Sequence, residues 1–101
     1  MKRFDVFINP QERFRKEFPY VVIVQSDLLD EFGTRAVVPL ARSRFAPSQI
    51  NPIIEFEEES FVFCAQLVAA IPSKSLTKLR GNVSFAHSVI SRALDFLFAG
   101  F

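Results

Sequence analysis

The sequence is poor in the residues that most often perform covalent chemistry or hold metal ions. It has one cysteine, one histidine and no tryptophan among 101 residues. A single cysteine cannot form an internal disulfide, which favours a reducing compartment. One cysteine and one histidine also exclude the usual zinc clusters, which take four protein ligands or three plus water. Only three glycines are present, and they are too far apart to form a glycine-rich phosphate loop. We therefore expect no catalytic residues, no metal and no cofactor.

Net charge and long apolar runs are also lacking. Twelve basic and eleven acidic residues leave a net charge of +1, which creates no field that would select nucleic acid or an anionic membrane. No apolar run approaches the ~18 residues of a membrane span. The first residues carry two cations without an apolar segment behind them, unlike a signal peptide. We expect a cytoplasmic protein with no membrane partner and no direct sequence-specific nucleic-acid binding.

Apolar side chains, by contrast, are abundant. Half of the residues are hydrophobic and 13 are Phe. A chain of this length is expected to form a single domain over residues 1–101, which hides only about two-thirds of its unfolded surface. The surplus predicts an exposed apolar patch that binds a partner or a second copy of the chain.

Apolar alternation and β-branched runs predict a mostly β protein. We expect strands at residues 4–8, 20–24, 36–40, 53–56 and 61–68. The run YVVIV at 20–24 is continuously apolar, which predicts a strand buried on both faces. Gly33 supplies a positive φ for the turn before the third strand. Pro39 has no N–H and predicts an edge or a bulge there.

The segments between these strands carry turn and surface signals. Residues 11–17 are charged and predict a surface loop, and residues 42–52 predict a long connection. Residues 57–60 predict an acidic turn. Residues 73–83 predict a loop or a short extra hairpin.

One helix is predicted near the end of the chain, at residues 85–98. Ser84 is the expected N-cap, and Gly100 is placed to end the helix in a left-handed conformation. Apolar residues cover about 180° of this helix, whereas packing on one sheet needs a stripe of about 100°. We therefore expect two contacts, one with the sheet and one with another surface. Phe98 and Phe101 have no obvious place in a core.

The remaining candidates for chemistry have simpler interpretations. Cys64 alternates with apolar neighbours and is expected to be a buried, inert thiol. His87 falls on the polar side of the helix and is expected to face solvent. The three consecutive glutamates at 57–59 are expected to face water in their turn rather than to bind metal.

Two parts of the sequence resemble the CcdB family of bacterial toxins. The first is VQSDLLD at residues 24–30, followed by Thr34-Arg35 and VVPLA at 37–41; the second is ALDFLFAGF at 93–101. The resemblance covers essentially the whole chain. It implies a mostly β (α+β) fold, a partly open SH3-like antiparallel β-barrel with one C-terminal α-helix.

The resemblance also implies a function. Such proteins are homodimeric toxins of type II toxin–antitoxin modules that bind the A subunit of DNA gyrase and trap its cleavage complex. A CcdA-like antitoxin neutralises them with a disordered C-terminal segment that folds on binding. Holding a covalent intermediate open is an act of binding, so the toxin is not expected to be an enzyme.

Mapped by position, the resemblance assigns a gyrase-binding surface to seven residues: Leu28, Leu29, Asp95, Phe98, Ala99, Gly100 and Phe101. The best-known members of the family end in Trp-Gly-Ile, and this chain ends in Ala99, Gly100 and Phe101. Phe98 or Phe101 would then supply the aromatic area of the missing tryptophan. For Leu28 and Leu29, ordinary packing is the alternative.

Two other functions stay open from the sequence. MazF-type RNA-cleaving toxins share this barrel, and Arg35, Ser26 and Asp27 would then be candidates for an RNA site. Alternatively, the chain is a non-toxic homologue that still binds antitoxin, which the alanine at 99 favours.

Overall fold

A computed structural model describes residues 1–42 and 46–100, and for residues 30–32 its backbone alone. The strands are β1 (Asp5–Ile8), β2 (Tyr20–Ile23), β3 (Thr34–Arg42), β4 (Ile53–Phe56), β5 (Glu59–Phe63), β6 (Ala69–Pro72) and β7 (Leu79–Asn82), followed by the helix α1 (His87–Ala99). Short 3-10 helices lie between them: η1 (Glu12–Phe14), η2 (Asp27–Phe32), η3 (Ala65–Leu67), η4 (Ser73–Ser75) and η5 (Ser84–Ala86).

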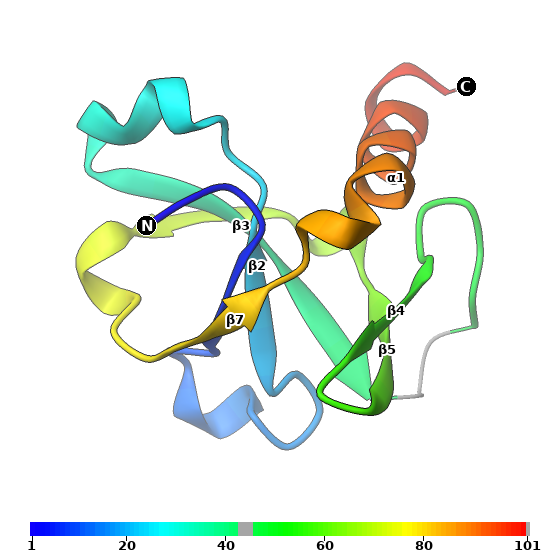
Figure 1. Ribbon diagram of the computed structural model, residues 1–101, viewed down its shortest axis with the longest axis horizontal. Helices are drawn as coiled ribbons and strands as arrows, with labels where there is room; N and C mark the ends of the chain where they lie inside the picture. Colours follow the sequence, from blue (N-terminus) through cyan, green and yellow to red (C-terminus); the bar gives the residue numbers. More distant parts are fainter. Residues whose placement is uncertain (43–45, 101) are drawn as a thin grey trace.

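These strands form one antiparallel sheet in the order β4-β5-β3-β2-β1-β7, with β6 also pairing with β3. The sheet curls into a half-barrel, and α1 lies over its open side (Figure 1). The predicted fold, a partly open SH3-like barrel with a C-terminal helix, is confirmed. No helix in the described ranges is long and apolar enough to cross a membrane.

Strand β2 divides its side chains between two apolar clusters. Val22 points into the larger cluster, which includes Ile90 and Ala93 of α1, whereas Val21 and Ile23 belong to a smaller one on the other side of the sheet. All three are at most 5% exposed. The prediction of a strand buried on both faces is therefore confirmed. The same alternation places α1 on only one face of the sheet.

Strand β3 is an interior strand that pairs with three others, β2, β5 and β6. Residues 34–37 pair with β6, residues 40–42 pair with β5, and residues 37–40 pair with β2 on the opposite side. The sequence predicted an edge or a bulge at Pro39; the edge is wrong, and an irregularity is found, because the partner strand is interrupted beside Pro39. Pro39 lies between the β5 and β6 registers, so its missing N–H removes no ladder bond.

The interruption at Pro39 also explains why the predicted strand at 61–68 ends early. Beside Val38 and Pro39, the five residues 64–68 separate the last partner in β5 from the first partner in β6. These residues loop out as η3 instead of continuing the ladder. Proline offers no donor to a strand running past it, so the chain leaves β3 there and rejoins it further on.

The ends of the predicted helix have opposite outcomes. At its C-terminus, Gly100 has φ +80° and its N–H donates to the Phe96 carbonyl at 2.9 Å, as predicted. At its N-terminus, Ser84 starts η5 and is not the N-cap of α1, which follows Ala86. The Asn82 carboxamide oxygen accepts the Ser84 N–H at 2.8 Å and caps η5 from outside.

The connections follow the predictions in part. Gly33 has the expected positive φ of 71°, although η2 stands where a tight hairpin was predicted. Residues 46–52 contain no strand, as expected, while residues 43–45 of that connection lie outside the described part of the chain. Residues 73–83, predicted as a loop or a short extra hairpin, form no hairpin of their own: they contain η4 and the single strand β7, which pairs with β1.

Strands β4 and β7 are the two ends of the strand order, and side chains join them. A Cβ atom on Gly81 of β7 would lie only 2.9 Å from Cε1 of Phe56 in β4. The Phe56 ring also meets the edge of Tyr20 at 5.2 Å between centroids. Above the rings, the Glu57 carboxylate accepts Arg80 Nη2 at 2.9 Å and the Tyr20 hydroxyl at 3.2 Å. This set of contacts, the β4–β7 seam, closes the barrel without a backbone ladder between the two strands.

The turn that delivers Glu57 to the seam is strained. Glu57 and Glu58 link β4 to β5 with φ values of +50° and +65°, the signs of a type I′ turn. Residues with a Cβ atom avoid this region at a cost of about 1 kcal/mol or more. The acidic turn is confirmed at 57–58, while Glu59 and Ser60 already belong to β5.

Replacing Glu58 with glycine should raise the free energy of unfolding by about 1 kcal/mol, because glycine adopts a positive φ without strain. Urea unfolding at neutral pH measures the change. The control is Glu58→Ala, which removes the same charge but keeps a Cβ atom and should gain less. Equal gains for both variants would show that charge, not backbone strain, dominates at the turn.

Candidate functional site

The turn after β2 presents two leucines to solvent. Leu28 is 89% exposed and Leu29 is 45% exposed. Hydrogen bonds stabilise this turn. The Ser26 hydroxyl accepts the Leu28 N–H at 3.2 Å, and the Asp27 carboxylate accepts the Arg3 N–H at 2.6 Å. Ordinary packing therefore does not account for Leu28, although the sequence left that alternative open.

The C-terminal end of α1 forms a second exposed patch. Phe98 is 73% exposed, and Asp95, Ala99 and Gly100 are exposed as well. Gly100 ends the helix by taking its left-handed conformation. Phe101, the last of the seven residues assigned by resemblance, lies outside the described residues.

A single copy of the chain does not bring these two patches together. In Figure 1, η2 and the C-terminal end of α1 both project from the upper end of the barrel but lie at opposite sides of it. The first patch carries Leu28 and Leu29, and the second carries Asp95 and residues 98–100. A partner that touches both must span the barrel end or meet two copies of the chain.

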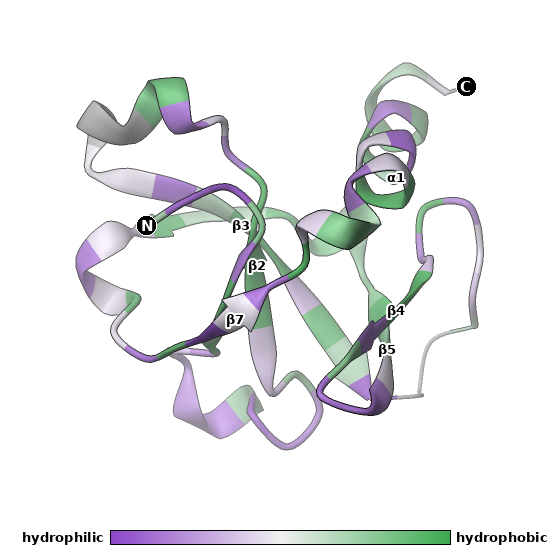
Figure 2. Cartoon of the chain, viewed as in Figure 1, coloured by the Kyte–Doolittle hydropathy of each residue, from purple (hydrophilic) through white to green (hydrophobic). Residues whose placement is uncertain are grey.

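The apolar arc of α1 is wider than the core requires. Ile90 and Ala93 are fully buried, and Leu97 packs against the same cluster. Phe85, just before the helix, is 65% exposed and Val89 is 38% exposed. Figure 2 shows apolar, green bands alternating with hydrophilic ones along α1. The predicted excess of apolar surface on this helix is therefore confirmed.

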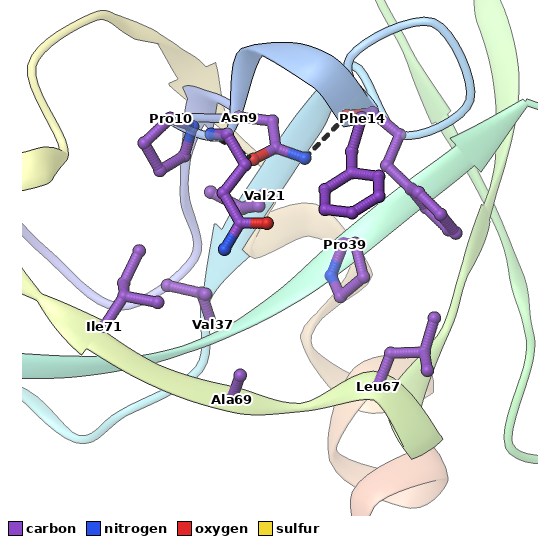
Figure 3. Close-up of a pocket in the computed structure, with 11 residues that line it drawn as sticks. Asn9, Pro10, Phe14, Val21, Val37, Pro39, Leu67, Ala69 and Ile71 are labelled. Carbon is purple, nitrogen blue, oxygen red and sulfur yellow. Dashed lines mark hydrogen bonds between the residues drawn. The ribbon is translucent and has the colours of Figure 1, made fainter.

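The sheet face opposite α1 carries a groove of about 330 Å³ (Figure 3). Its walls come from the loop after β1, from β2 and β3, and from η3 and β6: Asn9, Pro10, Gln11, Phe14, Phe18, Val21, Val37, Pro39, Leu67, Ala69 and Ile71. Asn9 fixes the loop, because its Nδ2 donates to the Phe18 carbonyl at 2.9 Å and its Oδ1 accepts the Gln11 N–H at 2.9 Å. Most of the other walls are apolar.

A second hollow of about 460 Å³ adjoins the groove through a shared residue, Phe14. It is lined by Arg13, Lys16 and Arg42, with one acidic residue, Glu17. The two hollows together form an apolar groove with a mainly cationic end. The groove is not predicted from the sequence, because the charged residues 11–17 indicate only a surface loop. The signal was present in the two phenylalanines, Phe14 and Phe18, in and beside that charged segment.

The remaining candidates for chemistry are buried or make contacts within the fold. Cys64 is fully buried, and burial raises the pKa of its thiol to about 11, with a smaller contribution from the charge of Glu17. The predicted inert thiol is confirmed. The exposed His87 ring meets the edge of Phe4 at 5.4 Å between centroids. Glu57 pairs with Arg80 in the seam, and Glu59 pairs with Arg42.

The three candidates for an RNA site also have roles in holding the fold. Arg35 is only 7% exposed, and its Nη1 donates to the Thr34 carbonyl at 2.8 Å. The Ser26 hydroxyl accepts the Leu28 N–H in η2, and the Asp27 carboxylate accepts the N–H of Arg3. All three residues therefore have a structural role.

The fold and the surface define a small β-barrel protein with a C-terminal helix and two exposed apolar patches. A family model described as CcdB protein matches residues 3–100, nearly the whole chain. The chain therefore belongs to the CcdB family, and the resemblance to that family is confirmed. Membership makes it a toxin of a toxin–antitoxin system.

The native Cys64 thiol should react slowly with iodoacetamide at pH 8. With a pKa near 11 about one thiol in a thousand is ionised there, against about a quarter for an ordinary thiol of pKa ~8.5. We expect alkylation at least ~200-fold slower than in the urea-unfolded chain, measured by mass spectrometry. Comparable rates in the two states would contradict the buried position of Cys64.

Proposed function

We propose that this toxin binds the A subunit of DNA gyrase and traps its cleavage complex, acting by binding and not by catalysis. Membership of the CcdB family supports the class of function. The observation that carries the proposal is the C-terminal end of α1, where Phe98 projects into solvent on an ordered helix that Gly100 brings to an end. An exposed aromatic on rigid backbone is a favourable anchor for a partner, because little side-chain entropy is lost on binding.

The aromatic at this end stands one position before the tryptophan of the best-known relatives. Ala99 offers little contact area of its own. Phe98 is 73% exposed and presents an aromatic ring from the same turn of the helix. We propose that Phe98 supplies the anchoring contact in this chain, with Leu28 as the anchor of the other patch.

We propose that the toxin acts as a homodimer. The excess apolar surface of α1, with Phe85 and Val89 exposed, supports a contact beyond the core. A two-fold dimer doubles each patch, and the A subunits of gyrase are themselves paired about a two-fold axis. Two copies could therefore meet both halves of gyrase at once, although the patches lie apart on one chain.

We propose that a CcdA-like antitoxin neutralises the toxin by laying its disordered C-terminal segment along the groove on the opposite sheet face. The apolar walls suit apolar side chains of such a segment, and the cations Arg13, Lys16 and Arg42 suit acidic ones. A segment that folds on binding can cover both hollows, because it pays its ordering cost only when bound. Phe14, at the junction, would touch both parts.

Replacing Phe98 or Leu28 with alanine should lower gyrase poisoning about 30-fold, the effect of losing a hot-spot contact of about 2 kcal/mol. The assay is the amount of linear DNA that purified gyrase leaves with each toxin variant. Leu79→Ala is the matched control, because Leu79 is 59% exposed on β7, outside both patches. Removal of residues 99–101 tests the rest of the tail.

Three results would revise this proposal. If Phe98→Ala and Leu28→Ala stay folded and as potent as the parent protein, the two patches are not the gyrase surface. If the parent protein binds antitoxin but leaves no cleaved DNA, it is the non-toxic homologue. Cleaved messenger RNA without gyrase–DNA adducts would establish the endoribonuclease instead.

Phe14→Ala should weaken binding of the cognate antitoxin's C-terminal peptide by about 10- to 100-fold, because it removes the side chain shared by both hollows. Lys16→Glu should act mainly on the association rate and make binding less sensitive to salt. Titration calorimetry and stopped-flow kinetics measure these effects, again with Leu79→Ala as the control. Unchanged affinity in Phe14→Ala would place the antitoxin elsewhere.

A further inference from the structure

The hydrogen-bonded ladder between β2 and β3 ends just beyond the pair of Ile23 and Val37. There the side chain of Gln25 replaces one backbone partner. Val24 N–H donates to the Ala36 carbonyl at 2.9 Å, as in an ordinary antiparallel pair. The reciprocal bond of such a pair would join the Ala36 N–H to the Val24 carbonyl, and two other bonds take its place. Ala36 N–H donates to Oε1 of Gln25 at 3.1 Å, and the Val24 carbonyl accepts Nε of Arg3 at 3.2 Å. Gln25 thus takes the place of a backbone carbonyl where the two strands part.

The amide nitrogen of the same side chain holds the excursion that follows. Gln25 Nε2 donates to the Leu29 carbonyl at 3.0 Å and to the Thr34 carbonyl at 3.1 Å. Leu29 interrupts the 3-10 helix with φ −108° and ψ 19°, so its carbonyl lies at a kink in η2. Thr34 is the first residue of β3, where the chain rejoins the sheet. The Gln25 carboxamide is therefore hydrogen-bonded to Leu29 at the kink, to Thr34 at the start of β3 and to Ala36 further along β3.

These three bonds use both N–H donors of the glutamine amide and one lone pair of its oxygen. No shorter side chain spans the same points, and glutamate has no hydrogens for the two carbonyls. The carboxamide is thus matched to the turn in both reach and polarity.

The hydrogen bonds of Gln25 matter for the position of Leu28, because apolar packing does not fix that residue. With 89% of its surface exposed, Leu28 gains almost nothing from the core, and its position depends on the polar bonds of its backbone. Ser26 and Asp27 anchor the first residues of η2, while Gln25 anchors its kink and its exit. A loop fixed before binding loses less entropy when a partner arrives.

We infer that Gln25 is a positioning residue for the gyrase contact, acting through Leu28 by fixing the shape of η2. This rests on the proposed function, in which Leu28 touches gyrase. Gln25 itself lies behind the turn, bonded to the backbone of three residues.

The test compares Gln25→Glu with Gln66→Glu. The first keeps an acceptor for Ala36 but loses both donors and sets a carboxylate against two carbonyls. Gln66 is exposed in η3, so the control makes the same change of charge away from the turn. Gln25→Met, which removes all three bonds without adding charge, separates the loss of bonds from repulsion. Thermal unfolding selects the variants that remain folded.

Two measurements decide the inference. Amide hydrogen exchange at Leu28 and Leu29 should become at least about 10-fold faster in Gln25→Glu and Gln25→Met, with Val22 and Val38 unchanged. Affinity for the purified gyrase A subunit should fall about 10-fold or more in both, and stay unchanged in Gln66→Glu. Because Gln25 acts through Leu28, adding Gln25→Glu to Leu28→Ala should cost little further affinity.

Unchanged exchange at Leu28 and Leu29 would overturn the inference. A full additional loss of affinity when Gln25→Glu is combined with Leu28→Ala would also overturn it, because Gln25 would then act by another route. If the parent protein shows no affinity for the gyrase A subunit, the proposed function fails instead. The exchange rates then still decide whether Gln25 holds the turn.

Discussion

The ring of Phe56 lies directly on the bare backbone of Gly81, and the curl of the whole sheet depends on that approach. Strands β4 and β7 stand at opposite ends of the strand order and share no ladder. Only a residue without a side chain lets the Phe56 ring come this close. Tyr20 supports the ring from β2, and the ion pair of Glu57 with Arg80 covers the contact. A strained turn at Glu57 and Glu58 is tolerated here because it aims the Glu57 carboxylate at β7.

The curled sheet separates the two surfaces that we propose for gyrase and for the antitoxin. Its concave face is filled by the larger apolar cluster and closed by Ile90 and Ala93 of α1. Helix α1 therefore ends beyond the barrel, with Phe98 exposed, at the same end as η2 (Figure 1). The opposite face, which α1 leaves uncovered, carries the groove. Two partners could accordingly be served by two faces, with the sheet between them as the physical link.

The sequence predicted those features that local chemistry decides. The strands at 20–24 and 53–56, the positive φ of Gly33 and the glycine end of α1 follow from short patterns, and each is found. Phe98, for which the sequence offered no obvious place in a core, is exposed. Two failures were non-local: the end of β5 depends on Pro39 in another strand, and the groove needs β6 beside the loop that carries Phe14. The third was local, because Asn82, two residues before Ser84, accepts the Ser84 N–H and caps η5.

The break beside Pro39 divides the pairing along one side of β3 into two ladders, one with β5 and one with β6. Strand β5 is held to β3 next to the fully buried Phe63, whereas β6 pairs with β3 through residues that are mostly exposed. Local opening follows such differences, and an exposed ladder opens more readily than one in the core. Since Leu67, Ala69 and Ile71 all stand on this second ladder or just before it, one wall of the groove is its most yielding part. The groove is therefore expected to adjust its width to what it binds, while the face that carries α1 keeps a fixed shape.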